Sequence, residues 1–206
     1  MNKTETLETG RLILRKVKLE DSHYAFLNCF SVPEVNKFLN WSTHETENKT
    51  KEFFKNIIER YKQEYEFAWV IEVKAIGQVI GLIEVVEQNS CHKRAEIGYQ
   101  IGKDYWGMGY TTEAVKAVIK YLFSLNYERV QGVCHEKNIA SERVLLKSGM
   151  FFEGLLASYG YSKKTNQPYN AKMYAIANQE GLCKRRLRNL INKKTATQEE
   201  CLLMQD

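Results

Sequence analysis

A glycine-rich segment offers the clearest chemistry in this 206-residue sequence. Gly107 and Gly109 flank a single methionine, and a run with helical apolar spacing begins a few residues later. Two glycines one residue apart let the backbone turn tightly and bring its N–H groups close to an anion. A helix that begins there adds free N–H donors and the positive end of its dipole. The spacing therefore favours a pyrophosphate-binding turn, and a plain strand-to-helix turn is the alternative.

Two common phosphate-binding loops are absent from the sequence. No G-x-x-x-x-G-K-[S/T] pattern occurs, and the dinucleotide pattern G-x-G-x-x-G fails because Thr112 stands where the third glycine is required. The sequence therefore argues against a P-loop nucleotide-binding protein and against a Rossmann dinucleotide-binding protein.

Apolar periodicity predicts the elements that would hold this turn in place. The expected strands cover residues 12–17, 67–74, 79–86, 95–101, 131–135, 151–157 and 172–177. The expected helices cover residues 20–30, 45–65, 112–125 and 139–148, the last with Asn138 as its N-cap and Gly149 at its end. Hairpins followed by strands that bracket a helix indicate a mixed sheet with helices on both faces, in the α/β or α+β class.

Composition and length fit one globular domain. Hydrophobic residues make up 44% of the chain and charged residues 27%, which excludes a disordered or collagen-like protein. No apolar run approaches the ~18 residues of a membrane span, and the N-terminus lacks the apolar core of a signal peptide. We therefore expect a cytoplasmic protein without a membrane partner. Its five cysteines form no C-x-x-C pair, so we expect free thiols and no metal site.

Charge divides the chain into two parts. Residues 181–206 carry six basic and three acidic side chains, whereas residues 1–180 are nearly balanced. We expect a domain over residues 1–180 and a basic C-terminal extension over residues 181–206. The extension could contact RNA, although a solvated chain end is the more common meaning of such a charge run.

Several motifs, taken in order, resemble the GCN5-related N-acetyltransferase (GNAT) family, and within it the branch that acetylates the N-termini of ribosomal proteins. The first motif is the opening strand Thr9-Gly10-Arg11-Leu12-Ile13-Leu14-Arg15. The second combines Ala95-Glu96-Ile97-Gly98-Tyr99, Trp106-Gly107-Met108-Gly109-Tyr110 and Glu113-Ala114. The third consists of Asn138, Ser141, Gly149, Glu153 and Gly154. The likeness extends over residues 7–178.

The resemblance implies a GNAT fold, in which the strands at 95–101 and 131–135 are parallel and splay apart within a mostly antiparallel sheet. Acetyl-CoA, the implied co-substrate, would place its pantetheine arm in the gap, paired with the strand backbone like an additional strand. Its pyrophosphate would lie on the glycine turn. The implied cofactor-binding residues are Tyr99, Ile101, Trp106, Gly107, Met108, Gly109, Tyr110, Thr111 and Asn138.

The implied reaction is direct attack of a neutral amine on the thioester of acetyl-CoA. An α-amino group, with a pKa near ~8, loses its proton more readily than a lysine near ~10.4. We expect an N-acetyltransferase for a protein N-terminus, with a ribosomal protein as the implied partner and a homodimer as a common assembly among relatives. A small amine, such as a polyamine or an aminoglycoside, is one alternative acceptor. A non-catalytic acyl-CoA- or RNA-binding module is the other alternative.

Two glutamates are candidates for the base. In the family, the face of 95–101 that carries Glu96 looks toward the acceptor, which suits a base that acts directly or through water. Glu84 alternates with Ile80 and other apolar residues on 79–86, where burial would raise its pKa. Each has a structural alternative, Glu96 as a carboxylate on a half-polar strand and Glu84 as an outward-pointing residue at a sheet edge.

Candidates for the acid and for the acceptor groove complete the implied site. Many relatives place a tyrosine acid seven residues after the motif asparagine, but this chain has Leu145 there. The Ser141 hydroxyl could protonate the leaving thiolate instead, or make a local backbone bond in the first turn of its helix. Phe38 and Trp41 would line the acceptor groove or cap the core.

Overall fold

The computed structural model describes residues 4–39, 41–62, 66–162 and 164–178, which include one eight-stranded sheet. In sheet order its strands are β1 (Leu7–Glu8), β2 (Leu12–Arg15), β3 (Ala68–Val73), β4 (Gln78–Asn89), β5 (Arg94–Ile101), β6 (Arg129–His135), β8 (Gln167–Ala177) and β7 (Phe151–Ser162). The α-helices are α1 (Ser22–Ala25), α2 (Glu47–Arg60), α3 (Tyr110–Ser124) and α4 (Ile139–Lys147). Shorter helical segments are η1 (Leu19–Asp21), η2 (Phe26–Phe30) and η3 (Lys103–Tyr105).

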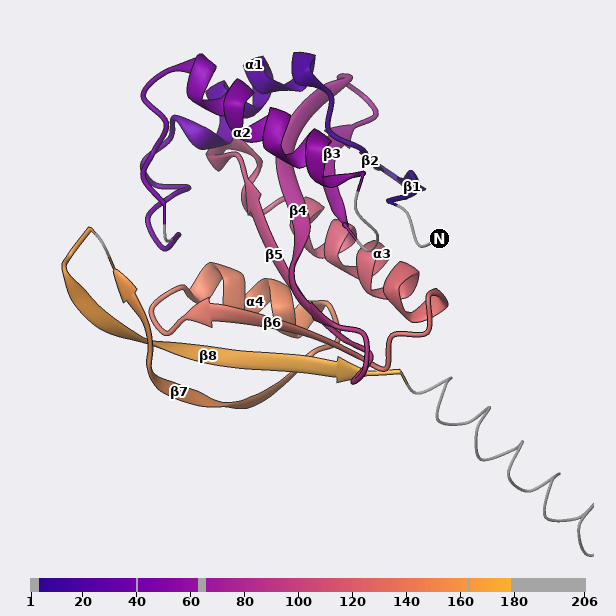
Figure 1. Cartoon of the computed structure of the whole chain (residues 1–206), viewed down its shortest axis with the longest axis vertical. Helices are drawn as coiled ribbons and strands as arrows, with labels where there is room; N and C mark the ends of the chain where they lie inside the picture. The colour runs from indigo at the N-terminus through magenta and orange to yellow at the C-terminus, as the bar shows by residue number, and fades with distance from the viewer. Residues whose placement is uncertain (1–3, 40, 63–65, 163, 179–206) are drawn as a thin grey trace, which may run out of the picture. The chain divides into compact units, whose positions relative to one another are not determined.

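The central strands β5 and β6 are parallel neighbours, whereas β1 to β5 are joined in antiparallel pairs, as are β7 and β8. β5 and β6 pair over their first residues, from Arg94 opposite Arg129 to Glu96 opposite Gln131. Beyond these pairs the two ribbons diverge, and β8 and β7 follow β6 away from the direction of β5 (Figure 1). The expected mixed, mostly antiparallel sheet with splayed parallel strands is confirmed.

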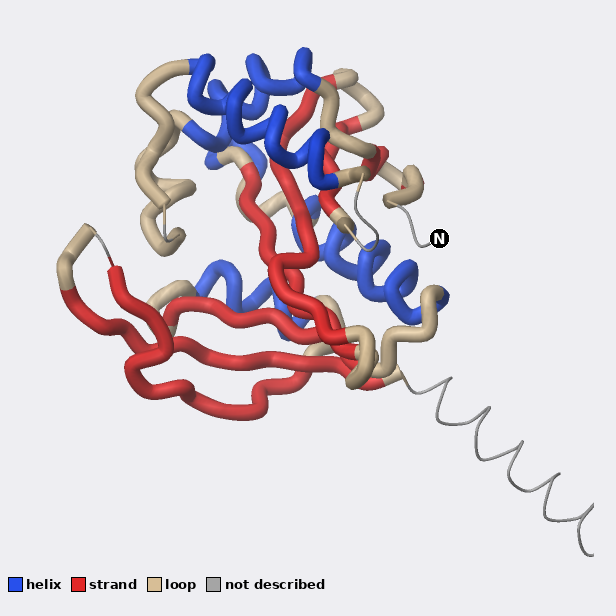
Figure 2. The backbone as a smooth tube through the Cα atoms, in the orientation of Figure 1, coloured by secondary structure: helices blue, strands red, loops and turns tan. Residues whose placement is uncertain are grey.

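The helices pack against the sheet through two apolar cores. One core joins α3 and α4 to the strands, and its buried members include Ile97, Val115, Val118, Leu122 and Leu145. The other joins α1, η2 and α2 to the strands, and its buried members include Phe30, Phe54, Ile57, Val70 and Leu82. Figure 2 shows α1 and α2 as one group of helices and α3 and α4 as another. The helices therefore divide between two cores, as expected for a sheet covered on both faces.

A β-bulge in β4 decides which of its side chains share a face. The register between β3 and β4 shifts at Ile71/Glu72, so that Ile80 has no direct partner. Ile80 packs in the α3 core, whereas Leu82 packs in the α2 core. The predicted common face of Ile80 and Glu84 is therefore wrong, because the bulge reverses the alternation between Ile80 and the residues that follow.

The helix predicted over 20–30 is irregular. It begins as η1 and α1 and ends in the π-helical η2, where the Ser31 N–H donates to the Phe26 carbonyl at 3.0 Å. Apolar spacing indicates a helix, but it does not distinguish an α-helix from a π-helix. In an α-helix each backbone N–H donates to the carbonyl four residues earlier, and in a π-helix to the carbonyl five residues earlier. Such π turns often occur at functional sites.

The remaining expected helices and strands are present, with shifted ends. β7 and β8 are longer than predicted, because their pairing continues from Leu156 and Ala171 out to Ser162 and Gln167. The expected extension over 181–206 lies outside the described residues. Within the described ranges, the structure contains no helix that is long and apolar enough to cross a membrane.

Candidate active site

A cavity of about 960 Å³ lies where β5 and β6 diverge. Its walls come from β4, β5, β6, α3, α4, the loop before α2, and the β7–β8 hairpin. All the predicted site residues line it except Met108 and Tyr110. The Met108 side chain is exposed, and Tyr110 packs under the Arg11 guanidinium, 4.4 Å from the ring centroid. The side chains of these two residues therefore do not line the cavity, and a ligand there can use only their backbone.

The glycine turn is built as its spacing predicts. Gly107 and Gly109 have φ angles of 77° and 81°, in the left-handed region that residues with a Cβ rarely adopt. Gly109 is the N-cap of α3, and among the described residues no atom beyond the two chain neighbours of Gly107 lies within 4 Å of the place where its Cβ would stand. The turn therefore presents the N–H groups at the start of α3 without a side chain over Gly107, which fits the pyrophosphate of a nucleotide such as CoA.

Two sequence motifs meet behind this turn. The Glu113 carboxylate accepts from Thr9 Oγ1 at 2.6 Å and from Arg11 Nε at 2.7 Å. Arg11 Nη1 also donates to the Met108 carbonyl at 2.9 Å, which fixes the peptide plane between Met108 and Gly109. Burial alone would raise the pKa of Glu113, but the hydrogen bonds from Thr9 and Arg11 lower it, so the carboxylate stays charged. The opening strand motif thus braces the glycine turn.

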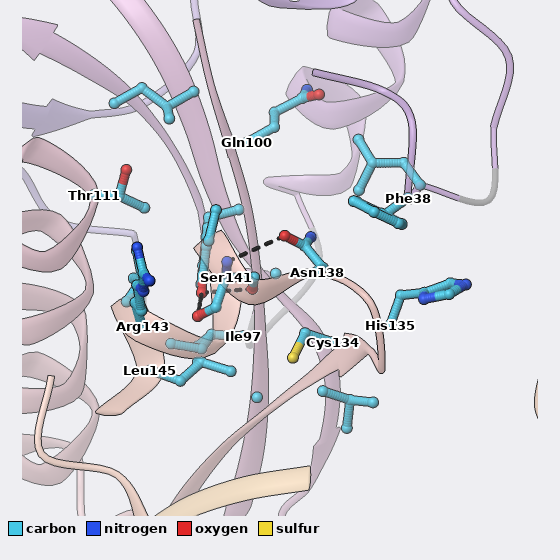
Figure 3. Close-up of a pocket in the computed structure, with 18 of the residues that line it drawn as sticks. Phe38, Ile97, Gln100, Thr111, Cys134, His135, Asn138, Ser141, Arg143 and Leu145 are labelled. Carbon is cyan, nitrogen blue, oxygen red and sulfur yellow. Dashed lines mark hydrogen bonds between the residues drawn. The ribbon is translucent and has the colours of Figure 1, made fainter. Parts of the chain in front are cut away.

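Asn138 and Ser141 are hydrogen-bonded to each other at the start of α4 (Figure 3), and Ser141 also contacts Tyr99 of β5. Asn138 Oδ1 accepts from the Ser141 N–H at 3.1 Å as the N-cap of α4, so its amide N–H groups stay available to a ligand. Ser141 Oγ lies 2.9 Å from Tyr99 Oη. Burial raises the pKa of Tyr99 well above its usual value, so the phenol stays protonated. Either hydroxyl can donate within this pair, and the Tyr99 hydroxyl also lies 3.2 Å from the Ser141 carbonyl oxygen, to which it can donate.

Other groups near Ser141 are poorly suited to acid or nucleophilic chemistry. Leu145 belongs to the core, and a Cβ on Gly132 would lie 2.6 Å from its Cδ2. Burial raises the pKa of the Cys134 thiol to about 11, so it is protonated near neutral pH. Among the described residues, no three His, Cys, Asp or Glu side chains form a group that could hold a metal ion.

A second wall of the cavity, the carboxylate face, consists of Leu82, Glu84, Glu96, Gly98 and Gln100. The β4–β5 pairing places Glu84 opposite Gly98 and Leu82 opposite Gln100. Partners in an antiparallel pair share a face, and so do alternate residues of one strand, so all five lie on one side of the sheet. The structure thus brings both predicted base candidates to the same face.

Burial raises the pKa of both glutamates. For Glu96 the rise is opposed by Gln131, whose Nε2 donates to Oε2 at 2.9 Å. For Glu84 it is opposed by the charge of Arg60, whose Nη2 lies 3.3 Å from Oε2. Glu84 lines the cavity and its side chain is only 15% exposed, so it does not point outward from a sheet edge. A carboxylate with a raised pKa accepts a proton more readily, which suits a base.

The loop between η2 and α2 and the β7–β8 hairpin close one side of the cavity. Phe38 and Trp41 line it from the loop, and neither belongs to the two cores of the described part of the chain. The Phe38 ring lies 5.0 Å from the His135 ring at the end of β6. Lys164 in the hairpin donates to the Asn36 carbonyl at 2.5 Å, which ties the hairpin to the loop. Both aromatic residues thus line the cavity and lie outside the two described cores.

Several polar side chains that line the cavity are not among the predicted site residues. Gln100 is 6% exposed, and both its amide atoms are buried without a hydrogen-bond partner among the described residues. In Figure 3, Gln100 and Phe38 lie on one side of the cavity and Arg143 on the other. Lys116 and Lys147 add further positive charge from α3 and α4. Strand alternation does place Gln100 on the same face as Glu96, although it assigns no role to it, whereas charges on helices are usually solvated and do not indicate a site.

The sequence was compared with protein families and with known proteins. A family model described as "Acetyltransferase (GNAT) domain" matches residues 11–151. An uncharacterized N-acetyltransferase, YoaA of Bacillus subtilis, is 34% identical over 171 residues, which cover 82% of this chain and 95% of that protein. Spermidine N(1)-acetyltransferase of Escherichia coli is 34% identical over 85 residues, or 41% of this chain and 46% of that protein. Ribosomal-protein-serine acetyltransferase of E. coli is 26% identical over 132 residues, or 63% and 73%.

Solved structures share the fold at low sequence identity. An acetyltransferase of the GNAT family from Bacillus anthracis has a TM-score of 0.74 at 24% identity, covering 84% of this chain and 98% of that one. The microcin C7 self-immunity acetyltransferase MccE, in complex with acetyl-CoA and AMP, has a TM-score of 0.74 at 19% identity, covering 82% and 94%. Ribosomal-protein-S5-alanine acetyltransferase from Vibrio fischeri has a TM-score of 0.71 at 20% identity, covering 85% and 97%.

Proposed function

Because the chain belongs to the GNAT family of acetyltransferases, we propose that it transfers an acetyl group from acetyl-CoA to the N-terminal amine of a protein. Acetyl transfer follows from the family. Acetyl-CoA as the donor and a protein N-terminus as the acceptor are our proposal, and the relatives that act on ribosomal proteins support this choice of acceptor.

The carboxylate face is the observation that carries the proposal. Glu84 and Glu96 stand on one side of the cavity, and burial raises the pKa of each. An amine arrives at neutral pH mostly as an ammonium cation, which carboxylates attract, and it must lose a proton before it can attack. An α-amine needs less help than a lysine or a polyamine, because its pKa is lower by about two units.

The opposite side of the cavity suits the donor. The N–H groups from Gly107 to Thr111 would hold the pyrophosphate, and Arg143 would add positive charge. The free amide N–H of Asn138 would donate to the pantetheine arm. When bound, acetyl-CoA supplies the thioester that the amine attacks.

Each predicted catalytic residue has one task in this scheme. Glu84 helps to hold the cationic acceptor, whose ammonium group first loses one proton to water. Glu96 then takes the second proton from the nitrogen as the neutral amine forms the new C–N bond. Ser141 donates a proton to the leaving sulfur as the C–S bond breaks and takes one back from water, while the Tyr99 hydroxyl holds the Ser141 hydroxyl in place. No covalent intermediate on the enzyme is required.

The unpaired carboxamide of Gln100 favours a peptide over a polyamine as the acceptor. A buried amide without partners costs free energy unless a ligand pairs with it. Its oxygen accepts and its nitrogen donates, and a peptide group, with one N–H and one carbonyl, matches both. A protonated polyamine only donates, so it would leave the amide nitrogen unpaired.

A panel of acceptors tests the proposal. Free thiol released from acetyl-CoA would be measured with N-terminal peptides, spermidine and an aminoglycoside, and the products identified by mass. We expect turnover with peptides that have a free α-amine and none with the same peptides blocked at the N-terminus. Turnover with spermidine alone would mean that the acceptor is a polyamine and not a protein N-terminus. Thermal stabilisation by acetyl-CoA without any turnover would favour a binding module instead.

The cellular setting is a further part of the proposal. We infer a ribosomal-protein N-terminus as the acceptor, a cytosolic location and a homodimer. Light scattering of the purified chain would test the dimer. Mass spectrometry of ribosomal proteins from cells with and without the gene would test the acceptor, since acetylation adds a defined mass to one N-terminus.

A further inference from the structure

A chain of hydrogen bonds runs from β7 to the carboxylate face. Glu153 accepts from Arg129 Nη1 at 2.7 Å. Arg129 Nε in turn donates to Gln131 Oε1 at 3.1 Å, and Gln131 Nε2 donates to Glu96 Oε2 at 2.9 Å. Gln131 is buried and stands directly opposite Glu96 in the last pair of β5 and β6 before they diverge. The chain thus reaches the cavity at the point where the strands separate.

Arg129 decides how the Gln131 amide is oriented. A guanidinium only donates, so Gln131 must turn its oxygen toward Arg129 and its NH₂ group toward Glu96. The two hydrogen bonds between Arg129 and Glu153 hold the guanidinium in place. A Gln131 N–H therefore meets Glu96 Oε2, and this contact favours the ionised carboxylate.

We propose that Gln131 is a positioning residue for the base, which holds Oε2 of Glu96 and leaves Oε1 to take the proton of the acceptor amine. The inference rests on the proposed function, in which Glu96 is that base. The amine proton passes to Oε1, the nitrogen lone pair forms the C–N bond, and the C–S electron pair leaves with the sulfur. The Glu153 of the third sequence motif then acts through Arg129, as the anchor of this chain.

Other charged groups also surround Glu96. Glu87 of β4 raises its pKa and Arg94 of β5 lowers it, while Tyr159 of β7 lies close enough for its own pKa to be raised by Glu96. These groups are unchanged when only the Gln131 side chain is altered, and Arg129, which loses one acceptor, keeps both of its hydrogen bonds to Glu153. A comparison of the wild type with a Gln131 variant therefore isolates the effect of the amide.

Gln131→Leu removes the donor and tests the proposal. We expect the midpoint of the kcat/KM profile to rise by about one pH unit, which means a roughly tenfold loss below that midpoint. Titration of the Glu96 carboxyl carbon by NMR should shift in the same direction without any substrate. Gln78→Leu is the matched control, since Gln78 begins β4 and does not line the cavity, and it should leave both readouts unchanged.

Arg129 variants give a second test if Gln131→Leu fails to fold. Arg129→Met lets the Gln131 amide turn, so the pKa of Glu96 should rise. Arg129→Lys keeps a donor toward Gln131, so the pKa of Glu96 should stay at the wild-type value. An active enzyme whose profile and Glu96 titration match the wild type in Gln131→Leu would overturn the proposal. If the wild type acetylates none of the acceptors, the proposed function fails, and the NMR titration still decides whether Gln131 controls Glu96.

Discussion

Ser141 stands at the start of α4 and Tyr99 lies in β5, yet their hydroxyl oxygens are 2.9 Å apart. The motif position alone indicated Ser141. It did not indicate the Tyr99 hydroxyl, because that residue was expected to act through its backbone. The pair exists because the fold brings the first turn of α4 next to β5, a strand far away in the sequence. A buried phenol with a raised pKa keeps its own proton and holds the serine hydroxyl in place.

Ser141→Ala should lower kcat by about tenfold and leave the acetyl-CoA Kd unchanged. The effect is modest because a thiolate with a pKa near ~8.5 leaves with little assistance. Steady-state kinetics and calorimetry would measure the two quantities. Tyr99→Phe should have a smaller effect, since the serine hydroxyl remains. If kcat in Ser141→Ala equals that of the wild type, solvent protonates the sulfur.

Glu96→Gln should lower activity by about 100-fold and raise stability at pH 7. Burial raises the pKa of Glu96 in the folded state, so the folded protein favours the neutral carboxyl group. This contribution to the free energy of unfolding is fully present below the pKa of the unfolded state and is lost as pH rises through the pKa of the folded state. At pH 7 the folded protein therefore contains a partly buried charge, which the neutral amide removes while Oε1 of the new glutamine can still accept from Gln131. Urea unfolding at pH 7 and pH 4 would measure the gain, which should be larger at pH 7. A loss of stability at pH 7 would contradict this assignment.

Gln100→Leu should stabilise the fold and weaken peptide binding. The substitution removes two buried polar atoms that have no partner in the described structure, a gain of about 1 kcal/mol in the free energy of unfolding. It also removes the group that we expect to pair with the peptide unit of the acceptor, so KM for a peptide should rise about tenfold. KM for spermidine, if it is used at all, should not change. Equal KM changes for both acceptors would mean that Gln100 does not discriminate between a peptide and a polyamine.

At the scale of elements, the glycine turn and the opening strand form one unit. Arg11 and Thr9 precede β2, and both bind Glu113 in the first turn of α3. Local sequence is sufficient to predict the turn, because left-handed backbone angles and a helix start depend on neighbouring residues. It cannot predict the brace, because the two motifs meet only through the folded sheet.

Gly107→Ala should raise the Kd for acetyl-CoA about tenfold, equivalent to ~1.4 kcal/mol of binding. Alanine would have to adopt the left-handed backbone conformation of Gly107, which is unfavourable for a residue with a Cβ. Its methyl group would also cover N–H groups that we expect to face the pyrophosphate. Gly77→Ala is the matched control, since Gly77 has a φ of 61° and, apart from its chain neighbours, no described atom within 4 Å of its Cβ position. Both variants should lose about 1 kcal/mol of stability. Equal acetyl-CoA affinity in the two variants would refute the phosphate turn.

At the scale of the whole molecule, a domain boundary near residue 180 is a prediction from charge alone. A chain that ends at Asn178 should keep full acetyl transfer and a melting temperature within about 2 °C of the complete chain. The described residues up to Asn178 contain the sheet, both cores and the cavity, so nothing in the proposed chemistry requires residues 179–206. Turnover assays and thermal unfolding would compare the two chains. Loss of activity on truncation would make the extension part of the catalytic unit.

The same pair of chains separates an RNA role from catalysis. If the basic residues of 181–206 contact RNA, affinity should fall steeply with salt for the complete chain and be much weaker for the shorter one. RNA binding by fluorescence anisotropy at several salt concentrations would measure this. Identical curves for both chains would leave the RNA-binding module without its main support.

The sequence by itself determined the motif order, the left-handed glycine turn, the caps of α4 and the mixed class of the fold. These features depend on residues close together in the chain, as the bond from the Ser141 N–H to Asn138 illustrates. Only the tertiary structure decided that Gln131 holds Glu96 and that Ile80 leaves the face of Glu84. Those arrangements arise from a bulge and from the divergence of β5 and β6, which are set by packing between residues distant in sequence.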